Sequence, residues 1–160
     1  MRMIRQWAKD EYSTVVCPGR YPLAFDLCCG LGGWTRGLKT AGWEVWGFDV
    51  DLDFRECYPG DRFYDLDVRT LPDTSLGCSK PDLIVASPPC QEFSRHDMPW
   101  TRTRNPPPPD KSIWEACITL ARVLETPIVI ENVRGAQLFM GKAKARYGSR
   151  YLWGDIPEFL

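Results

Sequence analysis

Short apolar segments that alternate with helical or turn-forming segments constrain the fold of this 160-residue chain more than any other feature. Four of the apolar segments predict buried strands: LAFDL (23–27), WEVWGFDVD (43–51), DLIVAS (82–87) and PIVIEN (127–132). RFYDLDV (62–68) favours a shorter strand, and RYLWG (150–154) a last one. Strands that alternate with helices predict an α/β domain with a mainly parallel sheet and helices on both faces.

Two helices are predicted between these strands. WTRGLKTAG (34–42) follows a glycine-rich turn, and KSIWEACITLARVLET (111–126) carries apolar residues at helical spacing. Residues 88–110, which include NPPPPD (105–110), are expected to form a loop, and 133–148 stay unassigned. We expect an N-terminal lead segment over 1–22 and one domain over 23–160.

Composition excludes several classes of protein. Hydrophobic residues make up 44% of the chain and charged residues 26%, which is typical of a soluble globular domain. Because we find neither a membrane-spanning segment nor a secretory signal, we expect a cytoplasmic protein. Seven cysteines with no C-x-x-C pair, and a single histidine at His96, fit neither a disulfide framework nor a structural zinc site, so no metal is expected.

Charge is distributed unevenly along the chain. The segment from Asn132 to Gly154 contains five basic residues and no acidic one. Such clustering suits a polyanionic partner, although a short basic run is more often a solvated face. The net charge of -1 and the pI near 5.9 argue against tight non-specific binding to nucleic acid.

Residues suited to binding or catalysis follow each of the first five predicted strands. In chain order they are Gly30, Gly32, Gly33, Asp49, Asp67, Cys90 and Glu131. In an open parallel sheet, ligands bind at the carboxyl ends of the strands. The sequence therefore predicts one ligand site that these residues share.

The glycine turn CGLGGW (29–34) and Asp49 together predict a nucleoside site. Glycines let a ligand approach the backbone closely, and a carboxylate at the end of the next strand accepts ribose hydroxyls. The spacing lacks the last glycine of a pyrophosphate-binding fingerprint, and no P-loop lysine follows. The pattern therefore favours adenosine without phosphates, and S-adenosylmethionine is the candidate cofactor.

The segment SPPCQEFS (87–94) places Cys90 on a turn after a buried strand. A cysteine is reactive as the thiolate, which needs an exposed and electropositive position, whereas most free cysteines are buried and structural. Glu131, at the end of another buried strand, can be protonated there and donate to a ring nitrogen. The two residues together favour a nucleophile and an acid over two structural side chains.

Three segments resemble, in order, the motifs of the carbon-5 class of cytosine-specific DNA methyltransferases. FDLCCGLGGW resembles the cofactor motif of that family, SPPCQEFS its Pro-Cys-Gln nucleophile loop, and ENV its glutamate motif. The chain also looks like the short versions carried by phages and prophages, which places it in the cytoplasm of a bacterium or an infected host. This resemblance implies a Rossmann-like, S-adenosylmethionine-dependent methyltransferase fold.

The resemblance also implies an activity and a set of site residues. Cys90 would add to carbon 6 of a flipped cytosine in DNA, and Glu131 would hold the ring nitrogen N3 while carbon 5 is methylated. Gln91 and Ser94 would belong to the catalytic loop. The residues implied for the cofactor site are Asp26, Gly30, Leu31, Gly32, Gly33, Asp49, Asp67 and Pro89.

The chain departs from the family pattern at several points. Cys28 stands where the family usually has a phenylalanine that packs on the cofactor. The Gln-x-Arg-x-Arg motif is absent; Arg146 and Arg150 are the candidate substitutes, and we favour Arg150 as a catalytic residue. No segment resembles a target-recognition domain, so a partner subunit or a dimer is a candidate source of target recognition.

Two other functions stay open. SPP also resembles the Ser-Pro-Pro-aromatic motif of methyltransferases that act on exocyclic amines of cytosine. Alternatively, the chain is a catalytically inert or partner-dependent nucleic-acid-binding module. Duplex DNA is the expected substrate, and RNA is not excluded because some relatives in the family act on tRNA.

Overall fold

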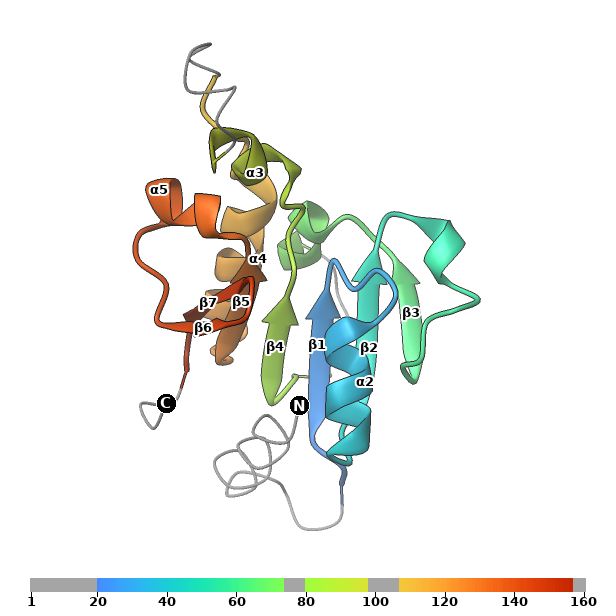
Figure 1. Ribbon diagram of the computed structural model, residues 1–160. Helices are drawn as coiled ribbons and strands as arrows, with labels where there is room; N and C mark the ends of the chain where they lie inside the picture. The colour runs from blue at the N-terminus through green and yellow to red at the C-terminus, as the bar shows by residue number, and fades with distance from the viewer. Residues whose placement is uncertain (1–19, 74–79, 98–106, 157–160) are drawn as a thin grey trace.

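The framework of the computed structural model is a seven-stranded sheet in the order β3-β2-β1-β4-β5-β7-β6; the structure describes residues 20–73, 80–97 and 107–156 (Figure 1). The last strand pairs, β5 with β7 (Arg150–Gly154) and β7 with β6 (Ala145–Tyr147), are antiparallel. Parallel pairing joins the other strands, which are β3 (Arg62–Asp65), β2 (Glu44–Asp49), β1 (Leu23–Leu27), β4 (Leu83–Ala86) and β5 (Ile128–Asn132). The predicted mainly parallel sheet is confirmed.

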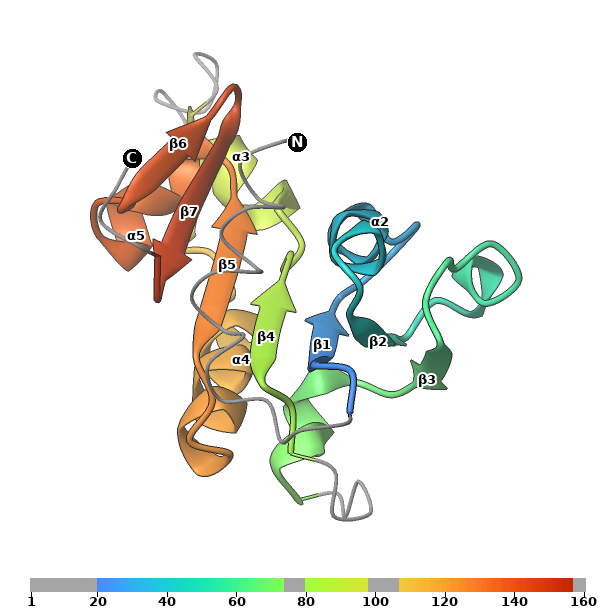
Figure 2. The same ribbon diagram turned by 90° about the horizontal axis from the view of Figure 1, so that it is seen from below.

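Helices cover both faces of the sheet, as predicted (Figure 2). Helix α2 (Gly33–Thr40) connects β1 to β2 on one face, where Leu38 packs with Val85 and Val129. Helix α4 (Ser112–Val123) precedes β5 on the other face, where Trp114 and Leu120 join the larger core. Strand β1 is buried along its whole length between these two layers.

Segments that the sequence left short or unassigned complete the fold. A hairpin of β6 (Ala145–Tyr147) and β7 (Arg150–Gly154) closes the sheet, so the predicted last strand at 150–154 is confirmed. Short helical segments occupy several connections: η2 (Leu52–Phe54), η3 (Val68–Asp73), η4 (Arg134–Ala136) and α5 (Gln137–Met140). The expected lead segment 1–22 lies almost entirely outside the described residues.

The prediction of a continuous loop over 88–110 is wrong for its first part. Helix α3 (Gln91–Asp97) begins directly after Cys90, whose carbonyl oxygen accepts a hydrogen bond from the Ser94 amide. Phe93 anchors this helix because its buried ring packs edge-on against Trp114 at 5.9 Å between centroids. Because this contact is made with a helix that is distant in the sequence, the local spacing of apolar residues does not predict it. Residues 98–106 of the expected loop lie outside the described part of the chain.

Asp26, in the middle of β1, supplies the cap that helix α2 lacks. The N-cap residue of α2 is Gly32, which has no side chain to accept a hydrogen bond from the helix amides. Asp26 Oδ2 instead accepts hydrogen bonds from the Thr35 amide at 3.2 Å and from Thr35 Oγ1 at 2.6 Å. A buried carboxyl of the strand thereby holds the first turn of the following helix.

Tyr58 extends this buried network toward the next strand. Its hydroxyl lies 2.7 Å from Thr35 Oγ1 and donates to it, because the Thr35 hydrogen is already directed to Asp26. The Tyr58 ring passes between two glycines: a Cβ added at Gly47 would lie 2.3 Å from the ring, and one added at Gly60 would lie 2.2 Å from it. Both positions therefore need glycine.

Within the ranges that the structure describes, every helix is too short or too polar to cross a membrane.

The buried carboxyl of Asp26 predicts how stability depends on pH. Its side chain is 1% exposed, and burial raises its pKa to about 7 from 3.8, against the opposing hydrogen bonds from Thr35. Between those two pH values the folded chain holds a proton that the unfolded chain has released, so the folded state loses stability as pH rises. The slope is at most about 1.4 kcal/mol per pH unit.

Asp26→Asn should remove this component, because the amide stays neutral throughout. The free energy of unfolding, measured by urea denaturation at several pH values between 4 and 7, should fall with pH more steeply in the wild type than in the variant. Parallel curves for the two proteins would contradict the assignment.

Candidate active site

Cys90 follows β4, and Glu131 lies near the end of the neighbouring strand β5, at the same edge of the sheet. β4 and β5 pair in parallel with Ala86 opposite Ile130, so the next residues along the two strands, Ser87 and Glu131, are also opposite each other. Cys90 comes after two prolines that end β4, and its side chain is part-buried rather than packed in the core. The sequence prediction that both residues share a strand-end site is consistent with this register.

Two side-chain hydrogen bonds tie the loop of Cys90 to the strand of Glu131. The buried Asn132 amide nitrogen donates to the Pro88 carbonyl oxygen at 2.9 Å. Ser87 Oγ lies 3.2 Å from Glu131 Oε2 and bonds to it. Because Pro88 precedes Cys90 by two residues, these bonds limit how far the Cys90 loop can move from Glu131.

The predicted cofactor turn and Asp49 are bonded directly. The Gly30 amide donates to Asp49 Oδ2 at 2.9 Å, and the Asp51 amide donates to Asp49 Oδ1 at 3.1 Å. A carboxylate offers about four lone-pair positions on its two oxygens, so each oxygen can still accept one ribose hydroxyl. The arrangement thus fits a nucleoside ribose.

The three glycines of the turn serve different purposes. A Cβ added at Gly32 would lie 2.6 Å from Pro59 Cδ, so Gly32 is needed for packing inside the protein. A Cβ at Gly30 or Gly33 would meet no atom within 4 Å, so both backbones border open space. Gly30 and Gly33 thus leave the turn open to a ligand, whereas Gly32 packs against Pro59 inside the protein.

Two exposed apolar side chains flank the Gly30–Asp49 bond. Leu31 is 61% exposed and Val50 is 63% exposed, although both follow buried strands. Exposed large apolar groups beside an open backbone are suited to cover a flat aromatic ring. Together with the free lone pairs of Asp49, they make the edge of β1 and β2 compatible with an adenosine group.

The carboxyl groups of Asp67 and Asp26 differ from that of Asp49 in their hydrogen-bond partners and burial. The Asp67 carboxylate is bonded to the Arg69 guanidinium, with both oxygens 3.0 Å from Arg69 Nε, and these hydrogen bonds hold the Asp67 pKa below its usual value. Asp26 is buried under the turn, and its Oδ1 is without a hydrogen-bond partner among the described residues. Contact of either residue with a cofactor stays a prediction.

Cys28, the residue at the position of the usual phenylalanine, faces α4. Interaction of its thiol with the buried Cys117 thiol, together with burial, raises the Cys28 pKa far above the ordinary range. Cys28 is therefore a protonated packing residue, and the aromatic contact of the family is missing here.

Arg150 lies on the Glu131 side of the sheet, whereas Arg146 lies on the other. Glu131 pairs with Leu152 across β5 and β7, and Arg150 is two residues from Leu152 on the same face. Arg146 pairs with Tyr151, stacks on its ring at 5.3 Å and donates to the Gly148 carbonyl. Its guanidinium is thus already engaged, which favours Arg150 of the two candidates.

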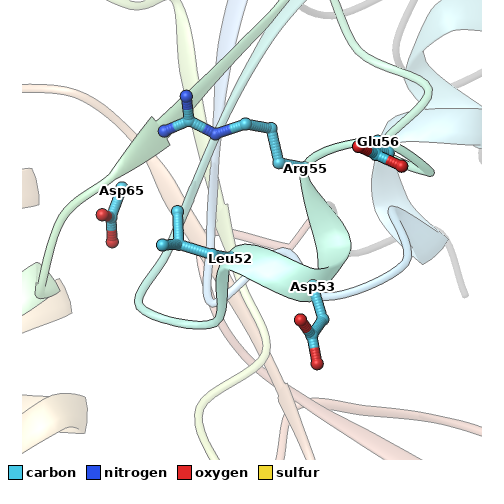
Figure 3. Close-up of a pocket in the computed structure, with 5 residues that line it drawn as sticks. All are labelled: Leu52, Asp53, Arg55, Glu56 and Asp65. Carbon is cyan, nitrogen blue, oxygen red and sulfur yellow. The ribbon is translucent and has the colours of Figure 1, made fainter.

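The remaining predicted residues lie in the loop around Cys90 and in α3. Pro89 and Gln91 are exposed, and Ser94 is part-buried in the first turn of α3. An open hollow of about 550 Å³ near β3 is lined by none of the predicted site residues (Figure 3). It is lined by Leu52, Asp53, Arg55, Glu56 and Asp65.

Sequence reasoning missed three residues that organise this edge: Trp34, Ser87 and Asn132. Trp34 Nε1 donates to Ser87 Oγ at 3.1 Å, and Ser87 in turn bonds to Glu131. Ser87 and Asn132 belong to the quoted motifs SPPCQEFS and ENV, so the signal was present without an indication of which atoms they contact. The link from Trp34 to Ser87 has no sequence signal.

Comparison with solved structures supports the fold. The chain is similar to a plantazolicin methyltransferase, BpumL, solved with SAH (12% identity, TM-score 0.53, covering 92% of this chain and 52% of that one). It is also similar to a SAM-dependent methyltransferase from Agrobacterium tumefaciens (14% identity, TM-score 0.50, covering 82% and 44%). The predicted Rossmann-like methyltransferase fold is therefore confirmed.

Comparison of sequences identifies the family. A curated relative, the type II methyltransferase M.AplI of Arthrospira platensis, is 33% identical over 72 residues, which are 45% of this chain and 21% of that enzyme. The chain thus matches about a fifth of the length of this relative. The family model for C-5 cytosine-specific DNA methylases matches residues 24–141, which include the glycine turn, Cys90 and Glu131. The chain belongs to the C-5 cytosine-specific DNA methylase family.

Proposed function

We propose that this protein transfers a methyl group from S-adenosylmethionine to carbon 5 of cytosine in DNA through a covalent adduct with Cys90. The observation that carries the proposal is the pair of bonds that join the Cys90 loop to the strand of Glu131, from Asn132 to Pro88 and between Ser87 and Glu131. The open glycine turn and Asp49 lie at the same edge of the sheet. A nucleophile, an acid and a cofactor turn are what methylation of a ring carbon needs.

The chemistry explains why both side chains are required. Carbon 5 of cytosine is a poor nucleophile until another group adds to the ring. The Cys90 thiolate forms a bond to carbon 6 of a flipped base, while Glu131 gives a proton to N3 and the electron pair of the ring double bond becomes available at carbon 5. When bound, S-adenosylmethionine supplies the electrophilic methyl group that carbon 5 takes up.

Release of the product reverses these steps. Loss of the carbon-5 proton to solvent restores the ring double bond and breaks the carbon–sulfur bond, which frees Cys90 as a thiolate. The N3 proton returns to Glu131. Arg150, on the Glu131 face of β7, is suited to bind the exocyclic oxygen of the same base.

The cofactor is proposed to lie over the glycine turn. Gly30 and Gly33 border open space, Asp49 accepts the ribose hydroxyls, and Leu31 with Val50 covers the adenine. Asp67 is proposed to reach the adenine amine with a lone pair that Arg69 leaves available, and Pro89 closes the side toward Cys90. Asp26 takes part from beneath the turn by holding Thr35.

Residues 23–160 are proposed to form the catalytic unit, with target recognition supplied by another subunit or a second copy. Duplex DNA is the proposed substrate, and tRNA is the alternative substrate. The exocyclic-amine alternative uses an aromatic residue where this chain has Cys90, and it leaves Glu131 without a role. Gln91 and Ser94 are proposed to move with Cys90 as the catalytic loop.

A trapping experiment tests the covalent mechanism. With an oligonucleotide that contains 5-fluorocytosine, the wild-type chain should form a stable protein–DNA adduct that depends on S-adenosylmethionine, because fluorine at carbon 5 blocks release of Cys90. Cys90→Ala should form none. Cys57→Ala, which removes a different exposed cysteine, should trap like the wild type.

Denaturing electrophoresis with duplex DNA, single-stranded DNA and tRNA side by side identifies the substrate. A wild-type chain that binds the cofactor but never forms the adduct would instead support an inert module or an exocyclic-amine enzyme. Analysis of the methylated base separates those two.

Asp49→Asn should weaken S-adenosylmethionine binding about tenfold or more, because a charge-assisted hydrogen bond to the ribose becomes a neutral one. Titration calorimetry without DNA measures this directly. Asp53→Asn, on the exposed segment just after Asp49, should leave the affinity unchanged. Equal affinities for the wild type and Asp49→Asn would argue against the proposed ribose contact.

Arg150→Ala should slow methyl transfer under single-turnover conditions more than Arg146→Ala does, because Arg146 is held on Tyr151 on the opposite face. A loss of about tenfold is expected for removal of one charge-assisted contact to the base. Both variants remove one positive charge, so a general electrostatic effect would slow them equally. That equal result would be evidence against a specific role for Arg150.

A further inference from the structure

A chain of two hydrogen bonds connects helix α2 to the proposed acid. Trp34 Nε1 lies 3.1 Å from Ser87 Oγ, and Ser87 Oγ lies 3.2 Å from Glu131 Oε2. All three side chains are part-buried. Neither Trp34 nor Ser87 takes part in the bond-forming steps proposed for Cys90 and Glu131.

The direction of these bonds follows from the donors available. An indole N–H can only donate, so Ser87 Oγ accepts the bond from Trp34. The hydroxyl hydrogen of Ser87 is then left to point at Glu131 Oε2. Oε2 is therefore an acceptor in this arrangement, so the proton that the proposed function requires on Glu131 would be carried by the other oxygen, Oε1.

The fold holds each member of this chain in place. The Ser87 amide donates to the Leu27 carbonyl at 3.1 Å, which continues the pairing of β4 with β1. Glu131 lies within β5, and Trp34 lies in the first turn of α2 against the core on that face. Groups fixed on strands and helices keep their hydrogen-bond geometry better than groups on loops do.

We propose that Trp34 and Ser87 are positioning residues that hold Glu131 with its Oε1 edge, and the proton on it, directed to N3 of the target cytosine. This inference rests on the proposed function of Glu131 as the acid. Trp34 aligns the Ser87 hydroxyl, and Ser87 aligns the carboxyl. Without the serine hydroxyl, either carboxyl oxygen can carry the proton and the side chain can rotate away from the base.

Kinetic variants of the full chain separate positioning from folding. Ser87→Ala should lower kcat about tenfold or more, while KM for DNA and the affinity for S-adenosylmethionine stay unchanged. Ser87→Thr keeps the hydroxyl and should restore most of the activity. Trp34→Phe keeps the ring but loses the N–H, and should lower kcat less than Ser87→Ala does.

The double variant Trp34→Phe/Ser87→Ala provides the sharpest kinetic test. It should be no slower than Ser87→Ala, because the indole has no other proposed route to Glu131. Trp46→Phe is the matched control, since Trp46 Nε1 donates to Glu44 at 2.8 Å outside the site; it should leave kcat unchanged. A Ser87→Ala variant as fast as the wild type would overturn the proposal, and so would strictly additive losses.

Nuclear magnetic resonance tests the same bonds without catalysis. The Trp34 indole N–H resonance, assigned by its absence in Trp34→Phe, should shift in Ser87→Ala and in Glu131→Gln and return toward its original position in Ser87→Thr. If the wild type neither traps nor methylates, the proposed function fails while this measurement still decides whether the three residues are linked. An indole resonance that neither variant moves would overturn the linkage.

Discussion

Parallel pairing of β1 with β4 and of β4 with β5 is the constraint on which the site depends. Parallel neighbours end at the same edge, so the glycine turn after β1, the cysteine loop after β4 and Glu131 at the end of β5 meet there. The strand order also reverses between β1 and β4. Helix α2, which follows β1, lies on one face of the sheet, and α4, which precedes β5, lies on the other face. In folds of this kind, ligands bind in the crevice where the strand order reverses.

Side-chain hydrogen bonds then hold the segments that follow the strands in place at this edge. Backbone pairing aligns the strands but leaves the loops after them free, and here Asn132, Ser87 and Asp26 hold those loops. Burying Asp26 costs folding free energy, because burial disfavours its charge and its Oδ1 has no hydrogen-bond partner among the described residues. Its position under an open glycine turn is consistent with a functional site, where polar groups are often retained at a cost in stability.

Most of the framework could be predicted from local patterns. The strand 23–27 was predicted with its observed bounds, and the strands at 82–87 and 127–132 were placed within a residue, because β-branched apolar runs bounded by prolines leave few alternatives. Helix α3 was missed because Phe93 is buried by contacts with Trp114 and Phe139, which lie far along the chain. At the candidate site, Cys90, Glu131 and Asp49 were predicted from residue type and spacing, whereas Trp34 was not, because its partner lies 53 positions along the chain.

The sequence by itself predicted which residues carry chemistry, and it determined at which strand ends they lie, since both follow from apolar patterning and short motifs. It also named the family, because three motifs in order are more specific than any one of them. Only the tertiary structure decided which neighbours each residue has: that Gly32 packs against Pro59 while Gly30 and Gly33 face open space, that Arg150 shares a face with Glu131, and that Cys28 packs against the core that contains Cys117. The physical reason is that hydrogen bonds and close contacts between distant segments depend on sheet register and side-chain direction, which the spacing of residues along a chain does not encode.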